Sequence, residues 1–236
     1  MSELVQEGNI FILYIPISFL IPKVEEIHRL LDIVERHEGP TALIITSKHP
    51  KIFSAGMDLK YMQKLGAGHG LPIFAALMGL YGRLLSFKVP TIAALNGHTI
   101  AGGLMLSLSL DYRIMAKGKF TMKMSELSLG LVLPRGGATL LSTKLGPATY
   151  RDLVLKCKTF SAEEALAKNI IDELVEPQDL MKRARELANE LSSLGDKKDV
   201  YECVKKSIYY DAIEITSKAE IRDIEWKTMG MEVPKL

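Results

Sequence analysis

The sequence predicts an α/β fold built around a buried, mostly parallel sheet. Short apolar runs rich in β-branched residues alternate along the chain with segments of helical periodicity, which is typical of α/β proteins. Residues 42–46 and 89–95 are continuously apolar, as expected of strands covered on both faces. The length of 236 residues and the 47% hydrophobic content suit one folded domain with a substantial core.

The same patterns assign the individual elements in chain order. We expect strands at residues 10–15, 42–46, 89–95, 111–116, 120–122 and 170–175. We expect helices at 24–37, 72–87, 101–110, 139–145, 148–156, 178–194, 199–209 and 212–229, and the glycines at 66–70 predict a loop that could open for a ligand. Ser161 and Glu164 form a capping box for one more short helix. Residues 1–175 should form the core, and residues 176–236 a helical region that packs on the core or on a neighbouring subunit.

Composition and spacing exclude several classes of function. The formal net charge is +2 and the charges are interspersed, which argues against nucleic-acid binding. Cys157 and Cys203 lie far apart and outside any metal-ligand spacing, so we expect no metal site, no disulfide scaffold and a reducing compartment. The apolar stretch at 10–21 is too short to cross a bilayer and contains Pro16, so we expect no membrane span.

The last three residues resemble a targeting signal. Pro234-Lys235-Leu236 has the small residue, cation and leucine pattern of the peroxisomal Ser-Lys-Leu signal, which an import receptor reads at a free C-terminus. We therefore expect the peroxisomal matrix as the location, with the cytoplasm as the alternative.

Two glycine-containing turns link a strand to a helix, at residues 54–57 and at Ala101-Gly102-Gly103. Backbone N–H groups at helix N-termini bind anions, and two of them aimed at one point stabilise charge that develops on a carbonyl oxygen. The alternative is that the glycines only permit tight turns and close helix packing. The residues alone leave both possibilities open.

Glu126 is the carboxylate with the most suggestive surroundings. It lies between a predicted strand and Gly130, and it is flanked by Met124, Leu127 and Leu129. A carboxylate in an apolar pocket has a raised pKa and becomes a usable base near neutral pH. Alternatively, Glu126 or its neighbour Ser125 caps a short helix. Walker A, Gly-x-Gly-x-x-Gly, His-Glu-x-x-His and Gly-x-Ser-x-Gly motifs are all missing from the sequence.

The order and spacing of these segments resemble the crotonase (enoyl-CoA hydratase/isomerase) superfamily over most of the chain. The resemblance rests on residues 53–59 (FSAGMDL), on residues 89–103 (VPTIAALNGHTIAGG) and on Asp111-Tyr112-Arg113. It implies a crotonase (ClpP-like) ββα spiral core with a C-terminal helical region. It also implies an acyl-CoA substrate, a homotrimer or hexamer, and no cofactor beyond the coenzyme A of the substrate.

The resemblance also implies roles for particular residues. The backbone N–H groups of Met57 and Gly102 match the oxyanion-hole donors of the family, and Glu126 matches a catalytic glutamate. The residues expected to contact the substrate or its coenzyme A are Ser54, Ala55, Gly56, Gly103 and Met105.

The family's hydratases use a second glutamate, and here Met105 occupies its position. The glutamate of another isomerase branch matches Pro134, and neighbouring Arg135 offers no carboxylate. A single glutamate suits a Δ3,Δ2-enoyl-CoA isomerase of the mitochondrial and plant peroxisomal type, acting in fatty-acid β-oxidation. The alternatives are another crotonase reaction, such as that of a hydratase, thioesterase or decarboxylase, or a non-catalytic acyl-CoA-binding protein.

Overall fold

The computed structural model describes residues 2–65 and 70–218, and within them ten strands form two sheets. The six strands of the large sheet are, in spatial order, β1 (Glu3–Glu7), β2 (Ile10–Ile15), β3 (Ala42–Ser47), β5 (Thr91–Leu95), β7 (Tyr112–Ala116) and β10 (Glu173–Val175). The four strands of the small sheet are β4 (Ile52–Ser54), β6 (His98–Ile100), β8 (Thr121–Lys123) and β9 (Phe160–Ser161). In each sheet one edge strand, β1 or β9, pairs antiparallel and the other pairs are parallel.

The helices of the described residues are α1 (Ile21–Arg36), α2 (Leu59–Leu65), α3 (Gly70–Leu85), α4 (Gly102–Leu108), α5 (Arg135–Lys144), α6 (Pro147–Leu155), α7 (Ala162–Ala167), α8 (Leu180–Ser192), α9 (Lys198–Ile208) and α10 (Tyr210–Lys218). None of them is long and apolar enough to cross a membrane.

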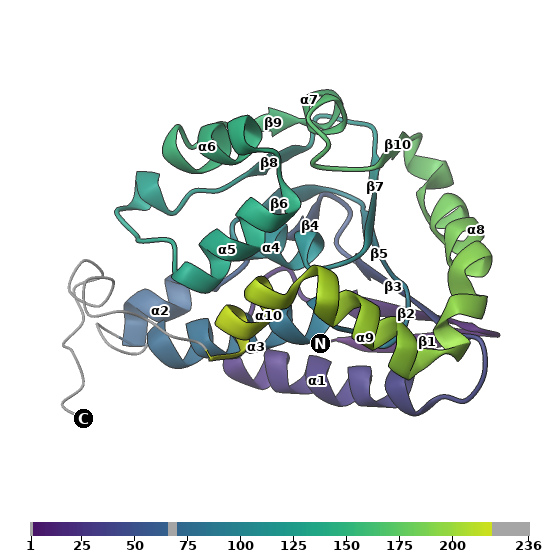
Figure 1. The fold of residues 1–236 in the computed structure, drawn as a ribbon. Coiled ribbons are helices and arrows are strands. Elements are labelled where there is room, and N and C mark those ends of the chain that lie inside the picture. The colour runs from purple at the N-terminus through teal and green to yellow at the C-terminus, as the bar shows by residue number, and fades with distance from the viewer. Residues whose placement is uncertain (1, 66–69, 219–236) are drawn as a thin grey trace.

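Helices cover both faces of the large sheet. Along β2, Ile10 and Ile12 pack in one apolar cluster with residues of α8, whereas Phe11 and Leu13 pack in another with residues of α1 and α3. This alternation follows from the two-residue period of a strand. Figure 1 shows α8 on the opposite side of β3 and β5 from α1 and α3.

Three successive units of two strands and a helix build the centre of the molecule. They are β3-β4-α2, β5-β6-α4 and β7-β8-α5, and in each unit the first strand joins the large sheet and the second joins the small one. Each chain segment therefore turns from one sheet into the other before it enters a helix. This is the ββα arrangement that the sequence resemblance implied.

Most elements lie where the sequence predicts them, and the α/β class is confirmed. The strand at residues 10–15 has the predicted bounds, and the capping box of Ser161 and Glu164 is formed by both of its hydrogen bonds. The predicted strand at 170–175 is wrong in its first half, because β10 pairs with β7 only over Glu173–Val175. β1 was not predicted, since its sequence is mostly polar. Of the loop predicted at 66–70, Gly70 is the first residue of α3 and the rest lies outside the described residues, as do the end of the last predicted helix and Pro234-Lys235-Leu236.

A buried ion pair fastens α9 to the core. The Lys205 ammonium, 4% exposed, lies 2.8 Å from the Asp111 carboxylate, which is 11% exposed. Asp111 also accepts hydrogen bonds from the Thr91 amide at 2.9 Å, the Thr91 hydroxyl at 3.0 Å and the Tyr201 hydroxyl at 3.2 Å. The Asp111 carboxylate thus joins Thr91 of β5 to α9.

The outer face of α9 is apolar and exposed. Val200, Val204 and Ile208 follow one another at intervals of four residues and are 62%, 54% and 61% exposed. Residues at this spacing share one helix face, so they form a continuous apolar stripe.

We predict that Asp111→Ala destabilises the fold severely. It would leave Lys205 as a buried charge without its partner, which costs about 3 to 5 kcal/mol. Urea denaturation followed by circular dichroism measures this loss. Asp199→Ala is the control, because the Asp199 carboxylate, 90% exposed, pairs with Lys88 at the surface and should matter by less than about 0.5 kcal/mol. A loss for Asp111→Ala as small as that of the control would contradict the anchoring role.

Candidate active site

The two-sheet topology brings three distant chain segments together. β4, β6 and β8 are neighbouring parallel strands, so their carboxyl ends meet at one edge of the small sheet. The segments that follow them are residues 55–58, Ala101 with the start of α4, and Ser125 with Glu126. Ligands of parallel sheets commonly bind at such an edge.

A cavity of about 340 Å³ lies at this edge. Its lining residues are Ser18, Ala55, Met57, Asp58, Leu59, Lys60, Phe74, Leu77, Met78, Tyr81, Ile100, Ala101, Gly102, Met105, Ser125, Glu126, Leu129 and Leu131. Most of these side chains are apolar, which suits a hydrocarbon ligand, and a few polar groups converge among them.

Five of the residues predicted for the site line this cavity, namely Ala55, Met57, Gly102, Met105 and Glu126. The other three, Ser54, Gly56 and Gly103, are not among the lining residues and lie in the wall behind it. The Ser54 hydroxyl accepts a hydrogen bond from the Gly56 amide at 3.2 Å, and a Cβ atom on Gly103 would lie 2.3 Å from the Ser54 carbonyl oxygen. These three residues shape the turns.

The backbone N–H of Met57 points away from Phe19, the residue that pairs with its chain segment. Met57 forms an isolated parallel bridge with Phe19, and the two hydrogen bonds of that bridge use the Gly56 carbonyl and the Asp58 amide. Because successive N–H groups of an extended chain point in opposite directions, the Met57 N–H is directed to the other side.

The Gly102 amide is free for a different reason. Gly102 is the first residue of α4, and the first N–H groups of a helix have no acceptor within the helix. Ala101, directly before it, has φ 52° and ψ −121°, a conformation that costs a residue with a side chain on the order of 1 to 3 kcal/mol. Such strain persists only where neighbouring contacts hold it.

The two turns touch through their backbones. Gly56 has φ +78°, and a Cβ atom placed on it would lie 2.6 Å from the Gly102 nitrogen. No side chain fits between them, so glycine is required at position 56 for both its conformation and its contact. This approach agrees with both roles considered for the glycines, close packing of the turns and an oxyanion site.

Glu126 brings a carboxylate into this apolar surrounding. Burial raises its pKa above the ordinary value of 4.5, and interactions with the backbone amides of Glu126 and Ser125 offset only part of this. Its Oε2 atom is buried and has no hydrogen-bond partner among the described residues. The alternative that Glu126 caps the following 3-10 helix is wrong, because no side-chain capping bond forms there.

Asp58 is a second carboxylate on the cavity wall, and the sequence analysis did not single it out. Its Oδ1 accepts a hydrogen bond from the Tyr61 amide at 3.0 Å in the first turn of α2, and its Oδ2 accepts one from the Ser18 hydroxyl at 3.3 Å. Both oxygens are therefore engaged. This distinguishes Asp58 from Glu126, whose Oε2 is unpartnered.

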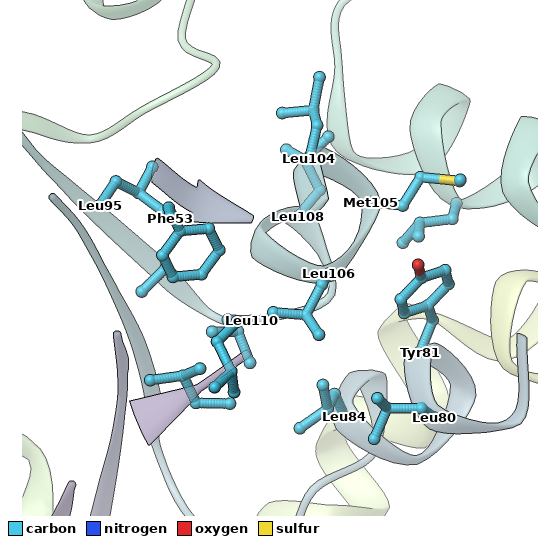
Figure 2. Close-up of a cluster of buried hydrophobic side chains, with 14 of the residues drawn as sticks. Phe53, Leu80, Tyr81, Leu84, Leu95, Leu104, Met105, Leu106, Leu108 and Leu110 are labelled. Carbon is cyan, nitrogen blue, oxygen red and sulfur yellow. The ribbon is translucent and has the colours of Figure 1, made fainter. Parts of the chain in front are cut away.

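Tyr81 of α3 is another lining residue that the sequence analysis missed. Its ring is fully buried, and its hydroxyl donates a 2.8 Å hydrogen bond to the Gly102 carbonyl. Figure 2 shows the Tyr81 side chain extending from α3 toward Met105 of α4. In the sequence it is one more large residue in an apolar helix.

Glu126 also borders a second cavity, of about 230 Å³. The residues lining it are Met124, Glu126, Leu127, Leu131, Val132, Leu133, Val154 and Leu155. Apart from Glu126, all of them are apolar. Within the described residues there is no group of three histidine, cysteine, aspartate or glutamate side chains placed to hold a metal ion.

The fold and this site correspond to a known family of enzymes. The family model described as enoyl-CoA hydratase/isomerase matches residues 21–231, so the chain belongs to this family, and the predicted crotonase fold is confirmed. It is accordingly an enzyme of the enoyl-CoA hydratase/isomerase class.

Curated relatives carry both isomerase and hydratase or dehydratase names. Enoyl-CoA delta isomerase 3 of Arabidopsis thaliana is 31% identical over 221 residues, which cover 89% of this chain and 92% of the relative. A carnitinyl-CoA dehydratase of Salmonella arizonae is 37% identical over 151 residues, covering 63% of this chain and 56% of the relative. Among solved structures, an enoyl-CoA hydratase from Mycobacterium ulcerans has a TM-score of 0.84 at 25% identity, covering 92% of this chain and 95% of its own.

We predict that Glu126→Gln stabilises the protein against unfolding, and increasingly so as the pH rises. A carboxyl group whose folded-state pKa is raised binds its proton more tightly when folded, so stability falls as the pH rises from its ordinary pKa of 4.5 through the raised folded value. Glutamine keeps the shape and removes this loss. Thermal unfolding of both proteins from mildly acidic to mildly alkaline pH would show a widening gap in Tm, whereas a constant gap would contradict the raised pKa.

Proposed function

We propose that this protein is a Δ3,Δ2-enoyl-CoA isomerase, which converts 3-enoyl-CoA to trans-2-enoyl-CoA. The observation that carries the proposal is Glu126, a carboxylate whose buried Oε2 atom has no partner among the described residues, in one apolar cavity with two backbone amides that lack partners in their own turns. The similarity to two enoyl-CoA delta isomerases of Arabidopsis thaliana, over 89% of this chain, supports the same reaction.

In the proposed reaction the thioester oxygen accepts hydrogen bonds from the Met57 and Gly102 amides. Glu126 takes a proton from C2, and the electron pair of that C–H bond forms a C1–C2 double bond while the negative charge moves to the thioester oxygen. The two amides stabilise this dienolate. The same carboxyl group returns the proton to C4, where the electron pair of the C3–C4 double bond forms the new C–H bond. The pair of the C1–C2 double bond moves to C2–C3, and an electron pair of the oxygen restores the thioester carbonyl.

The raised pKa of Glu126 suits both halves of this cycle. A carboxylate that is poorly solvated is a stronger base toward C2 than one in water, and its protonated form remains close to the anion it has created. Asp58 is a weaker candidate for the base because hydrogen bonds already occupy both of its oxygens.

Met105 bears on the choice between isomerisation and hydration. It is 3% exposed and lines the same cavity, where it offers neither a base nor an acid to a water molecule. The position of Met105 therefore supplies no second carboxylate for the addition of water, and both oxygens of Asp58, the other carboxylate of the cavity, already accept hydrogen bonds. Hydration is the second candidate, because a carnitinyl-CoA dehydratase and a short-chain-enoyl-CoA hydratase are among the similar proteins.

We predict that Glu126→Gln lowers kcat for 3-enoyl-CoA by about 10²- to 10⁴-fold, the usual contribution of a general base. The Kd of a saturated acyl-CoA should change by less than about threefold, because the amides that bind the carbonyl remain. Asp58→Asn is the matched control, a carboxylate in the same cavity that should retain most of the activity. Formation of the conjugated 2-enoyl thioester, followed by absorbance, gives the rate, and chromatography identifies the product.

Two results would overturn this assignment. Full activity of Glu126→Gln together with loss of activity in Asp58→Asn would transfer the role of base to Asp58. A 3-hydroxyacyl-CoA as the main product of the wild-type protein would make hydration its reaction.

The remaining proposals concern the setting of the enzyme. We place it in fatty-acid β-oxidation with no cofactor beyond the coenzyme A of its substrate. A peroxisomal location is supported by the 30% identity to a relative named as peroxisomal. A homotrimer or hexamer is supported by the exposed apolar stripe on α9, because contiguous exposed apolar surface marks interfaces.

We predict that Val204→Asp weakens this assembly. Val204 lies in the middle of the stripe between Val200 and Ile208, and a charge there would have to be desolvated in an interface. Sedimentation velocity at micromolar concentration should show smaller species than for the wild type. Leu166→Asp is the control, since Leu166 is an exposed apolar residue of α7, away from the stripe. Equal sedimentation of Val204→Asp and wild type would contradict a role of the stripe in assembly.

A further inference from the structure

Two hydrogen bonds hold the backbone at Gly102. One is made by Gly102 itself and the other by Ala101, the residue before it. The Ala101 amide donates to the Lys123 carbonyl at 2.9 Å, and the Gly102 carbonyl accepts from the Tyr81 hydroxyl at 2.8 Å. The peptide that carries the Gly102 N–H lies between these two anchor points. Its direction is therefore set jointly by β8 on one side and by α3 on the other.

Tyr81 is in close contact with this turn. A Cβ atom placed on Gly102 would lie 2.9 Å from the Tyr81 oxygen and 3.1 Å from the Gly56 Cα atom. The Gly102 backbone is thus confined between the phenol and the other glycine turn. Among the described residues, Tyr81 makes the one side-chain hydrogen bond to residues 101–103.

The hydroxyl remains a donor under all working conditions. It is fully buried, and this burial, with the neighbouring charge of Glu126, raises the pKa of Tyr81. Tyr81 also lines the cavity, so its side chain lies beside the position proposed for the reacting thioester.

From this geometry we infer that Tyr81 is a positioning residue of the reaction: its hydrogen bond to the Gly102 carbonyl holds the strained Ala101–Gly102 peptide with its N–H directed at the thioester oxygen. The inference rests on the proposed use of the Gly102 amide as an oxyanion donor. Without the hydroxyl, Ala101 can relax from its unfavourable conformation, and the Gly102 N–H turns away from the cavity.

The test is a measurement of carbonyl polarisation that does not depend on turnover. A 3-aryl-2-propenoyl-CoA has no proton at C4 to exchange, and its absorption moves to longer wavelength when hydrogen bonds polarise its carbonyl. We expect a clear red shift with the wild-type protein. Tyr81→Phe should lose most of the shift while binding the probe within about threefold of the wild-type Kd. Its kcat should fall by about 10-fold or more, short of the roughly 10²- to 10³-fold loss on removing an oxyanion donor outright.

Two further variants keep this test decisive. Tyr201→Phe is the control for loss of a buried tyrosine hydroxyl, because its hydrogen bond to Asp111 is remote from the cavity; it should lower Tm but keep the full red shift. A fluorinated tyrosine incorporated at position 81 keeps the shape of the side chain and donates a stronger hydrogen bond. It should preserve or increase the shift.

A full red shift in Tyr81→Phe would overturn the inference. So would loss of the shift in parallel with loss of probe binding and of Tm, which would indicate a general collapse of the site. A wild-type protein that binds the probe without any shift would overturn the oxyanion hole itself, and with it the proposed function.

Discussion

The approach of two backbone turns, Gly56 to Gly102, is the constraint on which the site depends. A single methyl group at position 56 would lie 2.6 Å from the Gly102 nitrogen, so the contact exists only while no side chain intervenes. The turns reach each other because β4 and β6 are adjacent parallel strands that end at the same edge of the small sheet. The ββα topology therefore brings the Met57 amide and the Gly102 amide, at the start of α4, to one cavity, and the proposed reaction needs a side chain only for the base.

The proposed oxyanion site requires a backbone that is held against relaxation. Ala101 occupies a conformation that most residues avoid, at the point where the chain leaves β6 and enters α4. The bond from the Ala101 amide to the Lys123 carbonyl restrains it on one side, and the contacts of Gly102 with Tyr81 and Gly56 restrain the next residue on the other. Preorganised donors of this kind stabilise developing charge effectively because folding has already oriented them, so no reorientation is needed during the reaction.

The sequence predicted the secondary structure of this molecule better than the residues of its candidate site. Strands made of apolar runs, such as β2 and β3, were found because burial on both faces leaves a strong pattern, whereas the mostly polar β1 exists through its antiparallel pairing with β2. Glu126 could be separated from a helix cap only by its spacing to the glycine turns. Tyr81 carried no signal, since an aromatic residue in an apolar helix is ordinarily core, and its contact with Gly102 joins residues 21 positions apart.

The two cavity carboxylates differ in their hydrogen bonds, and this difference supports Glu126 as the proposed base. Asp58 accepts a hydrogen bond on each oxygen, which fixes its position at the start of α2. Glu126 keeps one buried oxygen without a partner among the described residues, and burial raises its pKa. That same missing hydrogen bond is a cost to the fold. The apolar core around Glu126 sustains this cost, and in the proposed reaction it is relieved each time the carboxylate takes up a proton.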